Sequence, residues 1–402
     1  MSKRHKLFSC AINFFLFFTV TPAVSDSHII VVPQCLLKQL HAHYKILSTS
    51  SPFSLLEVDD EGINQLTEAK KFPCVISCGD FMDLTQSWND FSSHGETSIN
   101  RAKAFLVENI STRASLIHNK YQIKYFNEVN ALIQHINSQV MWSDLATLTR
   151  FPDRYVNSYN GLAALNWLKN KMENLIQVSG RKDVSIYTIP TGQHYKQPSL
   201  IIKIGNNQNG GIVLGAHIDT FYSKRELKPG ADDDGSGVVT LIEVAEKILN
   251  SNLHLKKPVY LIWYAGEELG LLGSESVVRN FKKKKIPIDA VLQLDMTSYI
   301  YRNNMSISIN TDYVNKDLTQ FLATLIQTYV KRKINFSKCN FACSDHASWF
   351  RQGYVTVFPF EGEKVNPYLH TARDRMEILS VAHMVDFTKL CIAFAIELAE
   401  PL

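Results

Sequence analysis

Six histidine and carboxylate side chains in the second half of the chain are of the types that bind metal ions. They are His217, Asp219, Glu267, Glu268, Asp295 and His370. The first five stand at the end of a short apolar run or just after one, and His370 stands in a later segment, NPYLHTARD. Two imidazoles with carboxylates suit zinc, manganese or cobalt, whereas an all-oxygen calcium site would not need the histidines. The residue types therefore favour a zinc-type centre.

The acidic turn PGADDDGSG, residues 229–237, offers a further carboxylate. Like charges repel, so either water screens the three aspartates in an exposed turn or a bound cation requires them. Two histidines are the natural number for two metals, and one carboxylate between the metals could bridge them. Two metals about 3.5–4 Å apart are a recurrent hydrolytic device. The pattern therefore indicates metal-dependent hydrolysis.

Each candidate also has a structural explanation when it is taken alone. His217 could be a satisfied core histidine, and GEELG could be a helix start whose acids favour the positive end of the helix dipole. Asp295 resists this explanation, because a buried carboxylate at the end of an apolar strand needs a partner or a cation. Ligands of open α/β sheets bind outside the carboxyl ends of the strands, so the shared placement of these residues favours one site.

Two of the acids are suited to roles beside the metals. Asp219 stands two residues after His217, where it can hold the second nitrogen of that imidazole. Glu267 and Glu268 are adjacent at a strand end and therefore point in different directions. One of them can bind metal while the other acts as a general base.

Alternating strands and helices must position these residues. Nearly all-apolar runs, typical of strands buried on both faces, occupy residues 199–204, 211–217, 258–265, 290–296 and 354–360. Helical spacing of apolar residues occupies 127–151, 160–176, 235–249, 314–330 and 382–399. The alternation predicts an α/β fold, a three-layer sandwich around a parallel or mixed sheet. Residues 26 to about 120 contain short mixed runs and none of this chemistry.

Composition and the first residues indicate an exported, soluble protein. Charged residues make up 20% of the chain, and the net charge of +4 is too small to imply a nucleic-acid partner. MSKRHK is a basic start, residues 7–21 form an apolar core, and PAVS suggests cleavage near Ser25. The alternative is an uncleaved membrane anchor. We expect a signal peptide, a periplasmic or extracellular location and no stable membrane anchor.

Six cysteines remain after that cleavage, which is too few for a disulfide-built scaffold. Cys339 and Cys343 in CNFAC are the closest pair in the later half, and an exported protein could oxidise them. Half of a four-cysteine metal site is the competing interpretation, but no second pair stands at a suitable distance. The pairing among Cys35, Cys74 and Cys78 stays open.

Six motifs, in this order, resemble those of the M28 family of zinc aminopeptidases, most closely its secreted bacterial leucyl-type members. They are GAHIDT, PGADDDGSG, YAGEELGLLGS, LQLDMTSY, CNFACSDHASW and YLHTARD. The resemblance covers roughly residues 130–400. It implies a phosphorylase/hydrolase-like sandwich with a mixed, mostly parallel sheet and two zinc ions. After the predicted signal peptide (1–25), it implies a pro-segment (26–120) and a catalytic domain (121–402).

The resemblance assigns a role to each matching position. One zinc would be bound by His217 and Asp295, the other by Glu268 and His370, with Asp233 as the bridge. Glu267 matches the general base, Asp219 matches the residue that orients His217, and Cys339–Cys343 matches a disulfide-closed loop beside the substrate pocket. Asp232 and Asp234 need not be ligands, since they can hold the turn through backbone amides. The implied reaction hydrolyses the first peptide bond of peptides or proteins, and we expect a monomer.

The substrate pocket departs from the family pattern in three places. Phe341 replaces a tyrosine, Asn310 replaces an aliphatic residue, and a shorter loop brings in Glu363. The other expected pocket residues, Met296, Phe358 and Phe360, are apolar. An apolar pocket favours Leu or Phe at the substrate terminus, whereas a carboxylate at its mouth favours Lys or Arg. Glu363 could equally be a solvated loop residue, so both preferences stay open.

Three other functions are compatible with this fold. A glutaminyl cyclase-like transferase would work with a single zinc, and a non-catalytic ectodomain would be expected to have lost ligands or the base. A carboxypeptidase or amide deacylase would differ only in substrate geometry. Retention of both histidines and all the carboxylates favours the two-metal peptidase.

Overall fold

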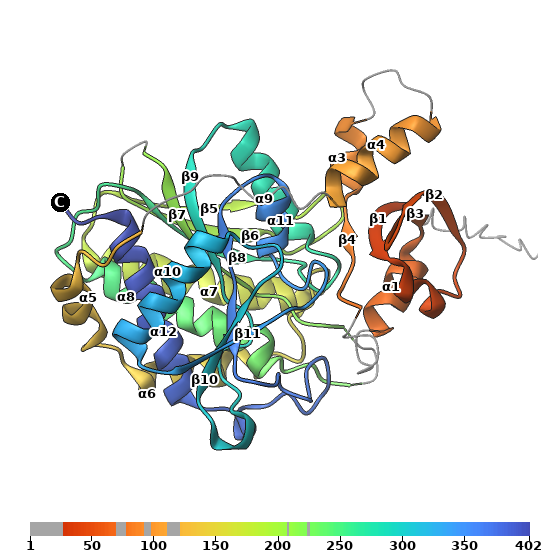
Figure 1. Ribbon diagram of the computed structural model, residues 1–402. Helices are drawn as coiled ribbons and strands as arrows, with labels where there is room; N and C mark the ends of the chain where they lie inside the picture. The colour runs from red at the N-terminus through yellow and green to blue at the C-terminus, as the bar shows by residue number, and fades with distance from the viewer. Residues whose placement is uncertain (1–26, 70–77, 92–97, 111–120, 207–208, 223–225) are drawn as a thin grey trace, which may run out of the picture.

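The computed structural model describes residues 27–69, 78–91, 98–110, 121–206, 209–222 and 226–402, which form two units (Figure 1). The N-terminal unit comprises the described residues up to 110, and the main unit comprises residues from 121 onward. The expected signal peptide and Cys74 lie outside the described residues. Among the described helices, none combines the length and the apolar character needed to cross a membrane.

A six-stranded mixed sheet forms the centre of the main unit, with the strand order β12-β9-β7-β8-β6-β5. The strands are β5 (Val184–Ile189), β6 (Ser199–Ile204), β7 (Gly211–His217), β8 (Val259–Tyr264), β9 (Ile288–Gln293) and β12 (Thr356–Val357). Neighbouring strands from β12 to β8 are parallel, and β6 pairs antiparallel with both β8 and β5. Every residue of β7 and β8 is buried, which explains their unbroken apolar sequences.

Helices cover both faces of this sheet and complete the predicted three-layer sandwich. On one face α8 (Gly237–Leu249) and α12 (Val381–Ala399) pack on β7. Four further helices pack against these two: α5 (Phe126–Ile133), α6 (Ser138–Leu148), α7 (Tyr159–Ser179) and α10 (Lys316–Leu325), which continues into η5 (Ile326–Val330). On the other face lie α9 (Leu272–Lys283), against β5 and β6, and α11 (His346–Arg351), against β9.

The apolar run 354–360, predicted as one strand, is divided between two sheets. Its first part is β12 in the central sheet, and its last part is β13 (Pro359–Glu361). β13 joins β10 (Ser306–Asn310) and β11 (Lys333–Ser337) in a three-stranded sheet. Between the two parts, the carbonyl of Phe358 accepts the Asn310 N–H at 2.9 Å. An apolar run indicates that a strand is buried, but it does not indicate which strand it pairs with. The sequence therefore could not predict that this segment changes sheets.

The N-terminal unit has its own antiparallel sheet in the order β2-β3-β1-β4. Its strands are β1 (His28–Pro33), β2 (Tyr44–Ser50), β3 (Phe53–Val58) and β4 (Met82–Asp83). Its helices are α1 (Asp60–Ala69), α3 (Thr85–Phe91) and α4 (Ser98–Ile110), with the short η1 (Gln34–Gln39). A disulfide joins Cys35 to Cys78, whose Cα atoms are 6.2 Å apart.

The N-terminal unit packs on the main unit beside α9, α11 and the loop 339–343 (Figure 1). The rings of Phe53 and Phe341 lie 4.6 Å apart, and the Asp80 N–H donates to the Phe341 carbonyl at 2.8 Å. At Gly79, whose φ is +79°, a Cβ would lie 2.5 Å from the Phe341 nitrogen. Across the interface, buried Glu275 of α9 accepts a hydrogen bond from Ser87, and Arg351 of α11 donates to Asn109 Oδ1. The interface is therefore both apolar and polar.

We expect the N-terminal unit to lose stability above neutral pH. His28 lies 2.7 Å from Asp83 and 3.0 Å from Asp60, and although burial opposes its charge, these carboxylates raise its pKa to about 9. Because the unfolded pKa is about 6.5, the stabilisation is complete below that pH and is lost as pH rises through the folded value. The free energy of opening of β1, measured by amide hydrogen exchange, should fall by on the order of 2 kcal/mol between pH 6.5 and 9.5. An unchanged pH dependence in His28→Gln would contradict this assignment.

Candidate metal centre

The first potential metal group lies where β7 and β9 end side by side. His217 is the last residue of β7, and Asp295 follows β9. The Nε2 atom of His217 lies 3.0 Å from Asp233 Oδ1 and 3.5 Å from Asp295 Oδ1. Because the two strands are parallel neighbours, their carboxyl ends necessarily meet at one edge of the sheet.

The second group shares one residue with the first. The Nε2 atom of His370 lies 3.0 Å from Asp233 Oδ2 and 3.2 Å from Glu268 Oε2. The two oxygens of Asp233 therefore face different histidines. In each group, one possible ligand atom per residue can be chosen so that all lie within 4.8 Å of one another. One carboxylate is therefore shared by two groups, each of which could hold a metal ion.

The chemistry of these donors fits zinc. The side chains are nitrogen and oxygen donors, and Asp295 Oδ1 makes no hydrogen bond to any described residue although it is buried. Burial opposes ionisation of Asp233, but the two imidazoles outweigh burial and hold its pKa well below the ordinary value. Burial instead raises the pKa of Asp295. Buried carboxylates crowded in this way require positive charge, which a metal would supply.

The flanking aspartates of the turn belong to neither group and accept hydrogen bonds from backbone N–H groups. Asp234 Oδ2 accepts the His217 N–H at 3.1 Å, and its Oδ1 accepts the Gly237 N–H at 2.9 Å. Asp232 Oδ1 accepts the Ser298 N–H at 3.1 Å. These bonds hold the short η3 segment (Ala231–Ser236), which leads into α8. Only the middle carboxylate of the three is shared by the metal groups.

Asp219 connects the ends of β7 and β8. Its Oδ1 lies 3.6 Å from His217 Nδ1 and accepts the Glu267 N–H at 3.0 Å, while its Oδ2 accepts the Glu268 N–H at 3.2 Å. Glu268 Oε1 in turn accepts the Phe221 N–H at 3.1 Å. Glu267 is 5% exposed and belongs to neither metal group. The backbone that carries both glutamates is therefore held by Asp219, which also lies beside the imidazole of His217.

The residues that were expected to line the substrate pocket differ in their exposure to solvent. Phe341 and Phe358 are 1% and 2% exposed, Met296 and Phe360 are partly buried, and Glu363 is exposed. Phe341 packs among side chains of the N-terminal unit, as described above.

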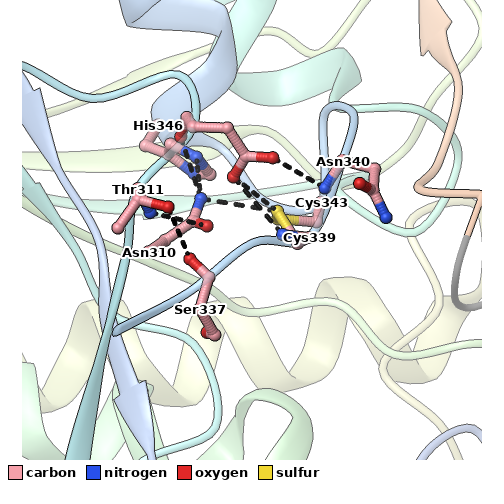
Figure 2. The surroundings of a disulfide bond; sticks show 8 residues. Asn310, Thr311, Ser337, Cys339, Asn340, Cys343 and His346 are labelled. Atoms are coloured by element: carbon pink, nitrogen blue, oxygen red, sulfur yellow. Dashed lines mark hydrogen bonds between the residues drawn. A yellow bond between two sulfur atoms is a disulfide. The ribbon is translucent and has the colours of Figure 1, made fainter. Parts of the chain in front are cut away.

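The expected disulfide between Cys339 and Cys343 is present, and Asn310 is fully buried beside it (Figure 2). Its Nδ2 lies 3.3 Å from His346 Nε2 and 3.4 Å from Cys339 Sγ, and it donates to the Asp312 carbonyl at 2.9 Å. Burial lowers the pKa of His346 to about 3, so this imidazole is neutral and can accept a hydrogen bond. The amide of Asn310 is thus committed to supporting the disulfide-closed loop.

Two residues that support the acidic turn escaped the sequence analysis. Asp374 accepts the backbone N–H groups of Asp232 and Asp233, each at 3.1 Å. Arg154 donates to the carbonyls of Pro229 and Gly230 at 2.5 and 2.9 Å. Asp374 is the last residue of the motif YLHTARD, but it was given no role there. Arg154 carries no sequence signal, because it acts on backbone atoms that are distant along the chain.

An α/β sandwich that gathers two imidazoles and three carboxylates at the carboxyl edge of its sheet has the design of a metallohydrolase. Residues 199–395 match the sequence model of a protein family that is described as Peptidase family M28. Leucine aminopeptidase 1 of Penicillium rubens is 32% identical over 86% of this chain and 90% of its own length. The chain belongs to peptidase family M28.

Solved structures agree with this assignment. The crystal structure of the Legionella pneumophila LapA aminopeptidase matches with a TM-score of 0.85 and 37% identity, over 93% of this chain and 99% of that one. LapB from the same organism matches with a TM-score of 0.85 and 36% identity, over 93% and 100%. Matches of this extent necessarily include part of the chain before residue 121. Both units therefore have counterparts in structures of this kind.

Proposed function

We propose that this protein is an aminopeptidase with two zinc ions that removes the first residue of peptides. The observation that carries the proposal is the division of the two Asp233 oxygens between two separate donor groups. Family membership supports hydrolysis of peptide bonds, and the named aminopeptidases among the relatives support action at the amino terminus. His217 and Asp295 would hold one zinc, Glu268 and His370 the other, and Asp233 both.

The metals would supply Lewis acidity and lower the pKa of a bound water. The protein would supply the base and the geometry. Glu267 would accept the proton of the attacking water and deliver it to the leaving amine. Asp219 would orient His217 through its Nδ1 and keep both glutamates in place through their backbone N–H groups.

A panel of aminoacyl-p-nitroanilides and a metal count test this proposal together. We expect hydrolysis to stop when a chelator removes the metal and to return when zinc is restored, with close to two zinc ions per chain by elemental analysis. A count near one, together with cyclisation of amino-terminal glutamine, would favour the glutaminyl cyclase-like alternative. Activity that survives complete metal removal would contradict metal-dependent hydrolysis altogether.

The same panel decides the substrate preference. We propose that Leu and Phe are preferred, because Phe358, Met296 and Phe360 are apolar and Glu363 is exposed, and within the described part of the chain Glu363 forms no salt bridge. The amide of Asn310 does not alter this expectation, since it is bonded to the loop itself. A preference for Lys or Arg that disappears in Glu363→Gln would show instead that the loop carboxylate selects the substrate.

We further propose that the chain is an exported monomer without a stable membrane anchor, with a signal peptide of residues 1–25 and a removable pro-segment of residues 26–120. The separate sheet of the N-terminal unit supports a boundary before residue 121. Amino-terminal sequencing of the exported protein would locate both cleavage points. A mature chain that retains β1–β4 would overturn the pro-segment assignment.

A further inference from the structure

Arg154 is a fully buried arginine that donates to backbone carbonyls of two separate segments. Its Nε donates to Ile218 at 2.8 Å, and its two terminal nitrogens donate to Pro229 and Gly230 at 2.5 and 2.9 Å. Its own backbone N–H donates to Thr220 Oγ1 at 2.9 Å. A buried charge is costly unless it is well paired and hydrogen-bonded, so this placement implies a specific role.

The two segments that Arg154 joins carry the central residues of the metal groups. Ile218 follows His217 directly, and Pro229 and Gly230 open the turn that leads to Asp233. One rigid guanidinium therefore ties the end of β7 to the acidic turn. The distance of 3.0 Å between His217 Nε2 and Asp233 Oδ1 depends on how these two segments lie relative to each other.

Gly230 of the turn leaves space for the guanidinium. A Cβ on Gly230, whose φ is +51°, would lie 3.0 Å from a terminal nitrogen of Arg154 and 2.5 Å from the Asp233 carbonyl oxygen. Gly230 thus accommodates the arginine as well as the bend of the chain.

The charge of Arg154 is suited to its surroundings. Burial opposes the charge and lowers its pKa, whereas the carboxylates of Asp374, Asp234, Asp219 and Asp233 favour it. Arginine stays protonated under such conditions, and its planar donors match several carbonyls at once, which lysine cannot do. The residue therefore combines a permanent charge with a fixed geometry.

We propose that Arg154 is a positioning residue that holds the acidic turn against the end of β7, so that the shared carboxylate of Asp233 is in place before metal binds. A preformed site binds more tightly, because less ordering accompanies binding. This inference rests on the two-metal site proposed above.

Zinc affinity in the full-length protein tests this role. We expect Arg154→Lys and Arg154→Met to weaken zinc binding by roughly ten- to hundredfold in competition with a chromogenic chelator. Lysine should not restore affinity, because it keeps the charge but not the three-carbonyl geometry. The visible absorption of cobalt bound in place of zinc should also change in both variants, since the ligand geometry around Asp233 is altered.

Arg181 provides a matched control at the opposite edge of the sheet. It also donates to two backbone carbonyls, those of Ile248 and Leu253, at 3.3 and 3.0 Å, and it pairs with Asp183. Arg181→Lys and Arg181→Met should lower the Tm while zinc affinity and the cobalt spectrum stay as in the wild type.

Three results separate the possible outcomes. If Arg154→Lys folds and binds zinc like the wild type, the positioning role is wrong. If the wild type itself binds fewer than two metals, the proposed function fails before Arg154 is tested. If neither Arg154 variant folds, Thr220→Val and Thr220→Ser decide, because only the valine removes the acceptor of the Arg154 N–H. Weaker zinc binding in the valine variant alone supports the role, and equal binding in the two overturns it.

Discussion

Glu267→Gln is expected to lower kcat by roughly 10²–10⁴-fold while zinc content and affinity stay unchanged. The amide keeps the size of the side chain but cannot accept a proton from water. Glu267 is 5% exposed, belongs to neither metal group, and has its backbone N–H held by Asp219. The substitution should therefore remove the base without moving the ligands. Steady-state kinetics on a Leu substrate, paired with elemental analysis of the same sample, measure both quantities.

Glu243→Gln is the matched control for this substitution. Glu243 is also buried, in α8, where it accepts the Asn137 N–H and pairs with Lys247. It is outside both metal groups, so its variant should lose some stability and keep kcat. Full turnover by Glu267→Gln would refute the assignment of Glu267 as base. Loss of zinc together with activity would show that the glutamate is a ligand instead.

Asp233→Asn is expected to lose zinc from both groups, whereas Asp232→Asn and Asp234→Asn should keep it. The two Asp233 oxygens face His217 and His370, so an amide would turn its NH₂ toward one metal position and remove the negative charge shared by both. We expect zinc affinity to fall by at least roughly a hundredfold and activity to fall with it. Isothermal titration of the metal-free proteins with zinc gives the affinity and the number of sites.

The flanking substitutions should instead reduce stability. Asp234 accepts backbone N–H groups from His217, Gly237 and Met296, and an asparagine would place an NH₂ against one of these donors. Each flanking variant should lose about 1–3 kcal/mol of unfolding free energy in denaturant titrations. If Asp234→Asn releases zinc as completely as Asp233→Asn, the assignment of Asp233 alone as the metal ligand of the turn is wrong.

Much of the fold and the metal centre could be predicted because their signals are local. The apolar runs of β6, β7, β8 and β9 reflect burial on both faces of the sheet, and their order with the helices indicates the sandwich. Ligands of α/β sheets bind outside the carboxyl ends of the strands, so the sequence predicts that His217 and Asp295 lie at the same edge of the sheet. The pairing of His217 with Asp295, the pairing of Glu268 with His370 and the choice of Asp233 as the bridge instead came from the resemblance to the family.

The N-terminal unit shows where local signals fail. Its short mixed runs predicted no particular fold, yet they form a four-stranded sheet closed by the Cys35–Cys78 disulfide. The contact of Phe53 with Phe341 joins residues almost three hundred positions apart. Nothing in the sequence around either residue predicts that the other is its partner. Pairing between distant segments depends on the surfaces that the folded units present.

The sequence by itself determined the type of chemistry: two imidazoles and several carboxylates at strand ends, suited to zinc and hydrolysis. Only the tertiary structure decided how the crowded charges are distributed. In the folded protein the two oxygens of Asp233 lie beside two different histidines, whereas Asp232 and Asp234 accept hydrogen bonds from backbone N–H groups. Arg154 donates to a backbone carbonyl of the same turn. The reason is physical: residue type limits what a side chain can bind. Which partner it meets depends on the directions of backbone N–H and C=O groups, which exist only once the strands and the turn are packed together.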